Sequence, residues 1–133
     1  MKRTVLSLLL AAALGALAPS LAAQPSGAPA TVTLGDWILR DQAVGKLAPS
    51  PERTGQFDAL HRDIVAALGA ARAAVEAKAA AEAEPKVCLP PPGSVELSAE
   101  EIGTWLYTRP QSDYGDSLPE VMERFLAHRF PCR

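Results

Sequence analysis

The chain has 133 residues, with 13 lysines and arginines against 15 aspartates and glutamates and a formal net charge of −2. Hydrophobic residues make up 48% of it, but 25 of these are alanine, so the large apolar side chains can build one small domain at most. A mildly acidic chain binds phosphate poorly, which argues against a nucleic-acid partner. Two histidines and two cysteines are too few for most zinc or iron–sulfur sites unless carboxylates contribute. We therefore expect no metal and no other cofactor.

Residues 1–23 have the three regions of a secretory signal peptide. A basic pair stands at positions 2–3, an uncharged apolar run covers positions 5–18, and small residues follow. A membrane-spanning anchor needs about 20 apolar residues, and this run is shorter. Cleavage after Ala22 and cleavage after Ala23 both fit the small residues there. We expect the mature protein to be periplasmic and not attached to the membrane.

The start of the mature chain is predicted in two parts. Residues 24–33 contain prolines and a glycine and no charge, which indicates a flexible N-terminus. A single helical domain is expected over residues 34–133, but residues 34–47 are ambiguous. They fit a short buried strand, and they also fit a short helix capped by Asp36. In either case Trp37 should pack against the domain, because a large exposed tryptophan is unusual.

A long helix is predicted over residues 51–83. Ser50 offers a cap, Pro51 suits the first turn, and apolar residues recur at steps of three or four. Residues 70–83 are mostly alanine with interspersed charges, so helix propensity is high and buried area small. We expect this second half to fray or project. His61, at the edge of the apolar stripe, is expected to be a packed or rim residue rather than a general base.

Two more helices have clearly marked starts. Ser98 and Glu101 fit a capping box for a helix that begins at Ala99, and Ser117 and Glu120 repeat the pattern. The second of these helices has the strongest periodicity in the chain. Its apolar positions are Leu118, Val121, Met122, Phe125, Leu126 and Phe130.

Cys88 and Cys132 are the two cysteines of the chain. In an oxidising compartment such a pair most simply forms one disulfide. It would close a loop of about 45 residues, which is worth roughly 4 kcal/mol on the chain-entropy model. A redox-active pair is disfavoured because there is no Cys-x-x-Cys spacing to lower a thiol pKa. The proline-rich run at residues 90–93 cannot continue a helix and indicates a rigid, extended connector.

These features predict an all-α fold of three or four helices, without a substantial sheet, closed by the Cys88–Cys132 disulfide. The predicted core consists of Phe57, Leu60, Ile64, Trp105, Leu106, Leu118, Val121, Met122, Phe125, Leu126 and Phe130.

Residues 87–132 resemble the C-terminal half of the Rap/Tai family of periplasmic immunity proteins against type VI secretion amidases. Val87-Cys88-Leu89-Pro90, Trp105-Leu106 on an amphipathic helix and the terminal Phe130-Pro131-Cys132 carry the resemblance. It implies a small helical protein, often a homodimer, that blocks the substrate cleft of a peptidoglycan-cutting amidase effector. Family members usually have a further cysteine pair upstream of the Cys-Leu-Pro element, and residues 24–87 contain no cysteine. No inhibitory residue is therefore carried over.

The residues themselves give catalysis little support. Neither His61 nor His128 has a serine or cysteine nucleophile in a recognisable setting. Glu100 and Glu101 are neighbours on a helix and diverge in direction, unlike the facing carboxylates of glycoside hydrolases. We expect a protein that binds another protein and is not an enzyme. The resemblance favours an immunity or inhibitor protein, and the alternative is a small periplasmic acid-stress or chaperone-like helical protein.

The loop of residues 109–116 is the candidate partner-binding site. It joins two capped helices inside the disulfide loop, so its ends are held while its tip faces a partner. Its candidate contact residues are Arg109, Asp113, Tyr114 and Asp116, with Tyr114 as an aromatic anchor. The alternative interpretation is a solvated connector whose aspartates favour the start of the next helix.

Overall fold

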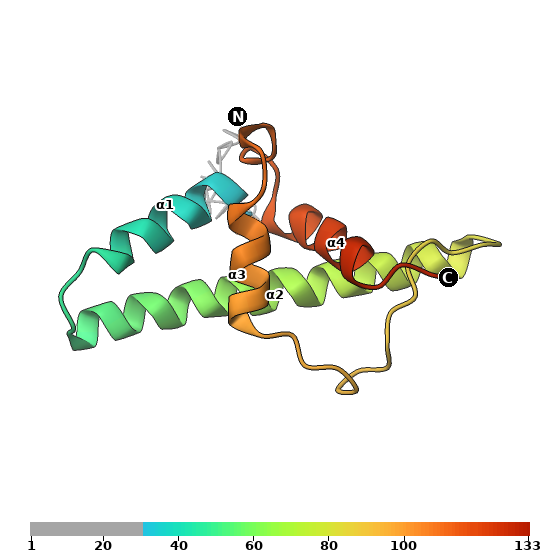
Figure 1. The fold of residues 1–133 in the computed structure, drawn as a ribbon, viewed down its shortest axis with the longest axis horizontal. Coiled ribbons are helices and arrows are strands. Elements are labelled where there is room, and N and C mark those ends of the chain that lie inside the picture. The colour runs from blue at the N-terminus through green and yellow to red at the C-terminus, as the bar shows by residue number, and fades with distance from the viewer. Residues whose placement is uncertain (1–30) are drawn as a thin grey trace, which may run out of the picture.

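The computed structural model describes residues 31–133, so the predicted signal peptide and most of the predicted flexible segment lie outside the described residues. Four α-helices and one short 3-10 helix make up the regular structure of residues 31–133, which contain no strand (Figure 1). This confirms the expected all-α fold. In chain order the elements are α1 (Leu34–Gly45), α2 (Pro51–Ala81), α3 (Ala99–Tyr107), η1 (Gln111–Asp113) and α4 (Leu118–Arg129).

The ambiguous segment that follows residue 33 is a helix, α1. Thr33, rather than Asp36, caps it, because the Thr33 hydroxyl accepts a hydrogen bond from the Asp36 amide at 3.2 Å. Trp37 lies on its buried face and is 7% exposed. The Trp37 indole N–H donates to the backbone carbonyl of Leu60 on α2 at 3.3 Å. The expected packing of Trp37 is confirmed, and this residue joins α1 to α2.

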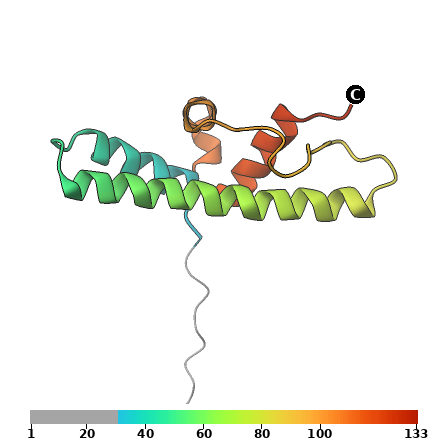
Figure 2. The same ribbon diagram turned by 90° about the horizontal axis from the view of Figure 1, so that it is seen from below.

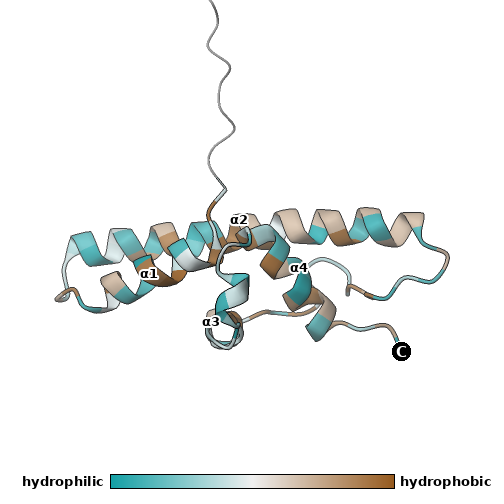
Figure 3. Ribbon diagram, turned by 90° about the horizontal axis from the view of Figure 1, so that it is seen from above, coloured by the Kyte–Doolittle hydropathy of each residue, from teal (hydrophilic) through white to brown (hydrophobic). Residues whose placement is uncertain are grey.

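Helix α2 runs along nearly the whole length of the described structure. Helix α1 lies antiparallel beside its first half (Figures 1 and 2). Ser50 caps α2 by accepting from the Arg53 amide at 3.1 Å, as the sequence predicts. The helix ends at Ala81, two residues before the predicted end. Bands of hydrophobic and hydrophilic residues alternate along α1, α2 and α4, as in helices with one buried face (Figure 3).

The alanine-rich second half of α2 packs against α4, so the prediction that it frays or projects is wrong. Ala71 is fully buried and Val75 nearly so. Beyond them the Lys78 ammonium pairs with the Glu123 carboxylate of α4. Alanine side chains bury little area themselves, but their small size allows α4 to approach α2 closely. The larger apolar residues of α4 then pack against them.

One core joins all four helices, and Phe57 is not part of it. Phe57 is 41% exposed because it borders a hollow, whereas Leu60, one turn further along α2, meets Trp37 of α1 and is buried. Trp105 and Phe130, also predicted to be core residues, are half-buried and pack against it. The buried set is Leu34, Trp37, Ile38, Val44, Leu60, Ile64, Ala67, Ala71, Val75, Ile102, Leu106, Leu118, Val121, Met122, Phe125 and Leu126.

Helices α3 and α4 begin where the sequence predicts, but only one of the two capping boxes is complete. At α4 the Ser117 hydroxyl accepts from the Glu120 amide, and the Glu120 carboxylate accepts from the Ser117 amide at 3.0 Å. The Ser117 hydroxyl also donates to the Glu120 carboxylate at 2.7 Å. This hydrogen bond, and after it the one from the Ser117 amide, lowers the pKa of Glu120. At α3 the Glu101 carboxylate instead accepts from Arg129 at 2.7 Å, because α4 brings that guanidinium within reach.

The sulfur atoms of Cys88 and Cys132 lie 1.99 Å apart, at disulfide distance. An isolated β-bridge between Val87 and Pro131 supports the same junction. Its hydrogen bonds run from the Cys88 amide to the Phe130 carbonyl at 2.9 Å and from the Cys132 amide to the Lys86 carbonyl at 3.0 Å. The connector after α2 is therefore fastened to the end of α4.

A second isolated β-bridge, between Thr33 and Ser117, joins the start of α1 to the start of α4. The Leu118 amide donates to the Val32 carbonyl at 2.9 Å, and the Leu34 amide donates to the Asp116 carbonyl at 3.0 Å. Val32 and Thr33 are thus paired with the backbone of a neighbouring segment. The flexible segment predicted for residues 24–33 does not extend to its last two residues.

Candidate functional site

The loop of residues 109–116 is docked on the first turn of α1. The Gly35 amide donates to the Tyr114 carbonyl at 2.9 Å. A Cβ at position 35 would lie 3.0 Å from that carbonyl oxygen, so this close approach favours glycine. The Tyr114 ring is half-buried and packs against the core. Part of this aromatic surface is thus already used within the chain.

The charged residues of the loop also have partners within the chain. The Arg109 guanidinium lies over the Trp105 ring, with 4.0 Å from its carbon to the ring centroid. Asp116 pairs with Arg124 of α4 at 2.6 Å, and Asp113 lies 3.8 Å from the same guanidinium. The structure therefore brings the two aspartates together on one arginine, whereas the Arg109 guanidinium lies apart from them, against Trp105 of α3.

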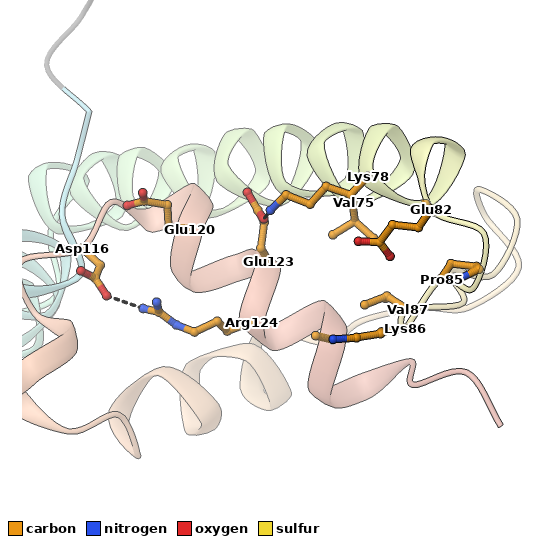
Figure 4. Close-up of a pocket in the computed structure, with 12 residues that line it drawn as sticks. Val75, Lys78, Glu82, Pro85, Lys86, Val87, Asp116, Glu120, Glu123 and Arg124 are labelled. Atoms are coloured by element: carbon orange, nitrogen blue, oxygen red, sulfur yellow. Dashed lines mark hydrogen bonds and ion pairs between the residues drawn. The ribbon is translucent and has the colours of Figure 1, made fainter.

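A cleft bordered by several charged side chains lies between the second half of α2, the turn that follows it and α4 (Figure 4). This α2–α4 cleft has a volume of about 550 Å³. Ion pairs cross or border it, Lys78 with Glu123 and Arg124 with Asp116. The hydrogen bond to Glu123 and the charge of that carboxylate raise the pKa of Lys78. Its charged side chains are Lys78, Glu82, Lys86, Asp116, Glu120, Glu123 and Arg124.

A second hollow, of about 680 Å³, lies where α3 crosses α2 beside α1. We call it the α2–α3 groove. The buried side chains of Leu60, Ile64, Ile102 and Leu106 are among those that line it. Its rim carries exposed apolar surface on both helices: Phe57 and Val65 of α2 are 41% and 55% exposed, and Tyr107 of α3 is 43% exposed.

The acidic groups of the α2–α3 groove are three carboxylates, one each from α1, α2 and α3: Asp41, Asp58 and Glu100. His61 also lines it, on the exposed side of α2, as a rim residue rather than a packed one. The Tyr107 hydroxyl donates to the Asp41 carboxylate. Partial burial, that hydrogen bond and the charge of Asp41 raise the pKa of Tyr107 to about 12. The phenol therefore stays a neutral donor at neutral pH.

Sequence reasoning assigned Phe57 to the core and so missed this groove. A signal was present: Phe57, His61 and Val65 stand at i, i+4 and i+8, so they form a second stripe beside the buried one. On α3, Gly103 and Tyr107 repeat the spacing of four. The sequence does not show which helices pack beside this stripe. Only the structure shows that they leave it exposed, so that it can act as a binding face.

The other residues considered for chemistry lie apart. Glu100 lines the α2–α3 groove while Glu101 pairs with Arg129, so the two neighbouring carboxylates do diverge. His128 is exposed near the end of α4. Residues 31–133 hold no group of three or more histidine, cysteine or acidic side chains placed to bind a metal ion. Within the same range, every helix is too short or too polar to cross a membrane.

Comparison of the chain with protein-family models, with curated proteins and with solved structures found no match.

Proposed function

We propose that this chain is an exported periplasmic protein that binds another protein, and that it acts as an immunity or inhibitor protein against a peptidoglycan amidase effector. The α2–α3 groove is the observation that carries the binding role. It exposes Phe57, Val65 and Tyr107 around one hollow, and exposed aromatic residues grouped around a concave surface are typical of protein interfaces.

The resemblance of residues 87–132 to the Rap/Tai family supplies the class of partner. Its two most specific motifs, Cys88-Leu89-Pro90 and Phe130-Pro131-Cys132, are far apart in the sequence and adjacent in space. The two bridging backbone hydrogen bonds between them, at 2.9 and 3.0 Å, support the interpretation that they form one unit. Such a unit holds α3, the 109–116 loop and α4 in a fixed arrangement before the partner arrives.

An inhibitor of this kind works by exclusion rather than by chemistry. A surface that is ordered in the free protein loses little conformational entropy on binding, so more of the contact free energy remains as affinity. The disulfide and the two β-bridges supply that order. The amidase would be inactive in the complex because peptidoglycan cannot enter its cleft, and we propose no enzymatic activity for this chain.

The test uses the oxidised mature protein and purified amidase effectors, with first choice given to one whose gene neighbours this one. We expect a complex that co-elutes on gel filtration and the loss of peptidoglycan hydrolysis at equimolar inhibitor. A chain with both cysteines reduced is the matched control and should inhibit less. Full hydrolysis in the presence of excess oxidised protein, with every amidase tried, would overturn the proposal.

The 109–116 loop remains a second candidate contact within the same function. If Tyr114 anchors the partner, Tyr114→Ala should weaken binding by about tenfold or more. Because the ring also packs on the core, a melting curve must show that the variant is folded. An unchanged dissociation constant for the cognate amidase would remove Tyr114 from the interface.

A periplasmic acid-stress or chaperone-like role is favoured by a different observation. Carboxylate–arginine pairs connect separate elements: Arg40 with Asp63, Arg124 with Asp116 and Arg129 with Glu101. A role in acid stress would require these contacts to open and the packing to loosen at low pH. This role predicts reversible binding of a hydrophobic dye on acidification together with protection of other proteins from aggregation. Acid exposure without protection would argue against it.

A further inference from the structure

We infer that the α2–α3 groove docks a partner segment in which apolar side chains are flanked by lysine or arginine. The inference rests on the proposed protein-binding function and assigns it to a surface and to a chemistry of partner. Two observations support it, the apolar surface of the groove and the sign of its charges. The same charges also argue against a second copy of the chain as the occupant.

The exposed apolar side chains of the groove stand on both of its walls. Phe57 and Val65 stand on the wall formed by α2, and Tyr107 stands on the wall formed by α3. Between the walls the groove reaches the buried side chains of Ile64 and Ile102. A segment with apolar residues on one face would cover these side chains and exclude water from them.

The charges select the partner's flanking residues. Asp41, Asp58 and Glu100 bring a carboxylate from each of the three helices to the groove. Within residues 31–133, the side chains that line the groove include no lysine or arginine. The nearby Arg53 guanidinium lies over the Phe57 ring, 5.3 Å from its centroid, and so is already engaged at one end of the groove. Electrostatic complementarity therefore favours a cationic segment over an anionic one.

A second copy of this chain is a poor occupant for the same reason. In a two-fold symmetric dimer each copy presents the same patch, so groove would face groove. Asp58 and Glu100 of one copy would then approach the same carboxylates of the other, which disfavours the contact. A different protein with the opposite charge avoids this repulsion.

Gly103 offers a way to block the groove without disturbing the fold. It lies in α3 and lines the groove, and a Cβ there would meet nothing within 4 Å. Gly103→Leu therefore places a side chain into the open space and improves helix propensity. Gly55→Leu is the matched control, since position 55 is also helical and equally open and does not line the groove.

The experiment measures the fluorescence anisotropy of two labelled amphipathic peptides of about four helical turns, one of leucine and lysine and one of leucine and glutamate. At physiological ionic strength we expect the leucine–lysine peptide to bind the wild-type chain at least about tenfold tighter than the other. Gly103→Leu should reduce that affinity by about tenfold or more, and Gly55→Leu should leave it unchanged. Equal binding of the two peptides, or full binding by Gly103→Leu, would overturn the inference.

Two double substitutions test whether the peptide is attracted by the carboxylates of the groove or by the net negative charge of the whole chain. Asp58→Asn with Glu100→Gln removes two carboxylates of the groove, while Glu84→Gln with Glu96→Gln removes two exposed carboxylates elsewhere. The groove pair should weaken the leucine–lysine peptide by about fivefold and reduce the salt dependence of binding, and the control pair should do neither. Equal losses in the two pairs would mean that the peptide binds the whole acidic surface, which would overturn the inference.

The outcome is distinguishable from failure of the amidase proposal. If Gly103→Leu still inhibits the amidase fully, the groove is not the docking site and the immunity function stands. If no amidase binds the wild-type chain but the peptide results hold, the groove stands and the partner class is wrong. If sedimentation shows a wild-type dimer that Gly103→Leu disrupts, a second copy covers the groove and the inference fails.

Discussion

Phe125 of α4 contacts Trp105 of α3. It is 1% exposed, and its ring meets Trp105 edge to face, with centroids 5.4 Å apart. The Arg109 guanidinium lies over the Trp105 ring, so Trp105 contacts both a charged residue of the loop and the buried Phe125 ring. These contacts tie a residue of the candidate loop to the interior of the protein.

Phe125→Ala is expected to lower the free energy of unfolding by about 3–5 kcal/mol, because it leaves a cavity next to Trp105 and removes a fully buried ring. Phe57→Ala is the matched control. Its ring is 41% exposed, so truncation should cost far less. Urea unfolding of the two variants measures the difference, and equal midpoints would contradict the packing described for α3 and α4.

Tyr107 is expected to make stability depend on alkaline pH. Its pKa is about 12 in the folded chain against an ordinary value of 10.0. Below pH 10 the phenol is protonated in both states and the contribution is fully present. Between pH 10 and 12 the unfolded chain loses the proton first, so stability falls as pH rises.

Ultraviolet absorbance of tyrosinate during an alkaline titration checks this shift. The wild-type protein should show a component with a midpoint of about 12 that Tyr107→Phe lacks. Thermal melts in the same pH range should fall less steeply for Tyr107→Phe than for the wild type. Melting temperatures that depend on pH identically in the two proteins would mean that neither burial nor Asp41 raises the pKa of Tyr107.

At the scale of elements, the two halves of α2 pack against different helices and carry side chains of different size. Its first half carries large side chains that meet α1 and α3 and leave Phe57 and Val65 on the groove rim. Its second half carries alanines against which α4 lies. The alanine-rich part therefore buries little apolar area of its own, but its small side chains let α4 approach closely.

Ala71→Leu tests this contact between α2 and α4. Ala71 is fully buried, so three added carbons must displace α4 or adopt a strained rotamer, at a cost of about 1–3 kcal/mol. Ala73→Leu, two residues further on the exposed side of the helix, should be close to neutral. A projecting helix would tolerate both substitutions equally, so equal melting temperatures would restore that interpretation.

At the scale of the whole molecule, two short backbone pairings and one pair of cysteines join segments that are distant in the sequence. Thr33 pairs with Ser117 at one end of α4, and Val87 pairs with Pro131 at the other. Helix α4 is therefore held at both ends, and α3 with its loop lies between these attachments. The α2–α3 groove and the 109–116 loop depend on this frame for their shape.

Replacing both Cys88 and Cys132 by serine should lower the free energy of unfolding by roughly 4 kcal/mol, from the entropy that the open loop gains in the unfolded state. That is a large share of the stability of a small domain. Urea unfolding of the variant and of the reduced wild type should agree with each other. No difference between oxidised and reduced protein would show that the β-bridge alone holds the junction.

The starts of three helices and the helical class follow from local chemistry, and the sequence alone predicted them. Caps, first-turn prolines and apolar steps of three or four act over one or two turns, so the starts of α2, α3 and α4 were read correctly. The pairing of Cys88 with Cys132 followed from their number. The loop of residues 109–116 was located in the same way, as the segment between two such helices.

Which surfaces meet was decided only by the tertiary structure, because packing depends on residues far apart in the chain. In it residues 34–45 form a helix and Phe57 lies outside the core. The Glu101 carboxylate accepts from Arg129 instead of from the Ser98 amide of its own helix cap. The tertiary structure also drew α4 onto the alanines of α2 and left the α2–α3 groove uncovered. A periodic stripe records which side chains share a face, whereas the neighbours brought against that face determine whether it becomes core or binding surface.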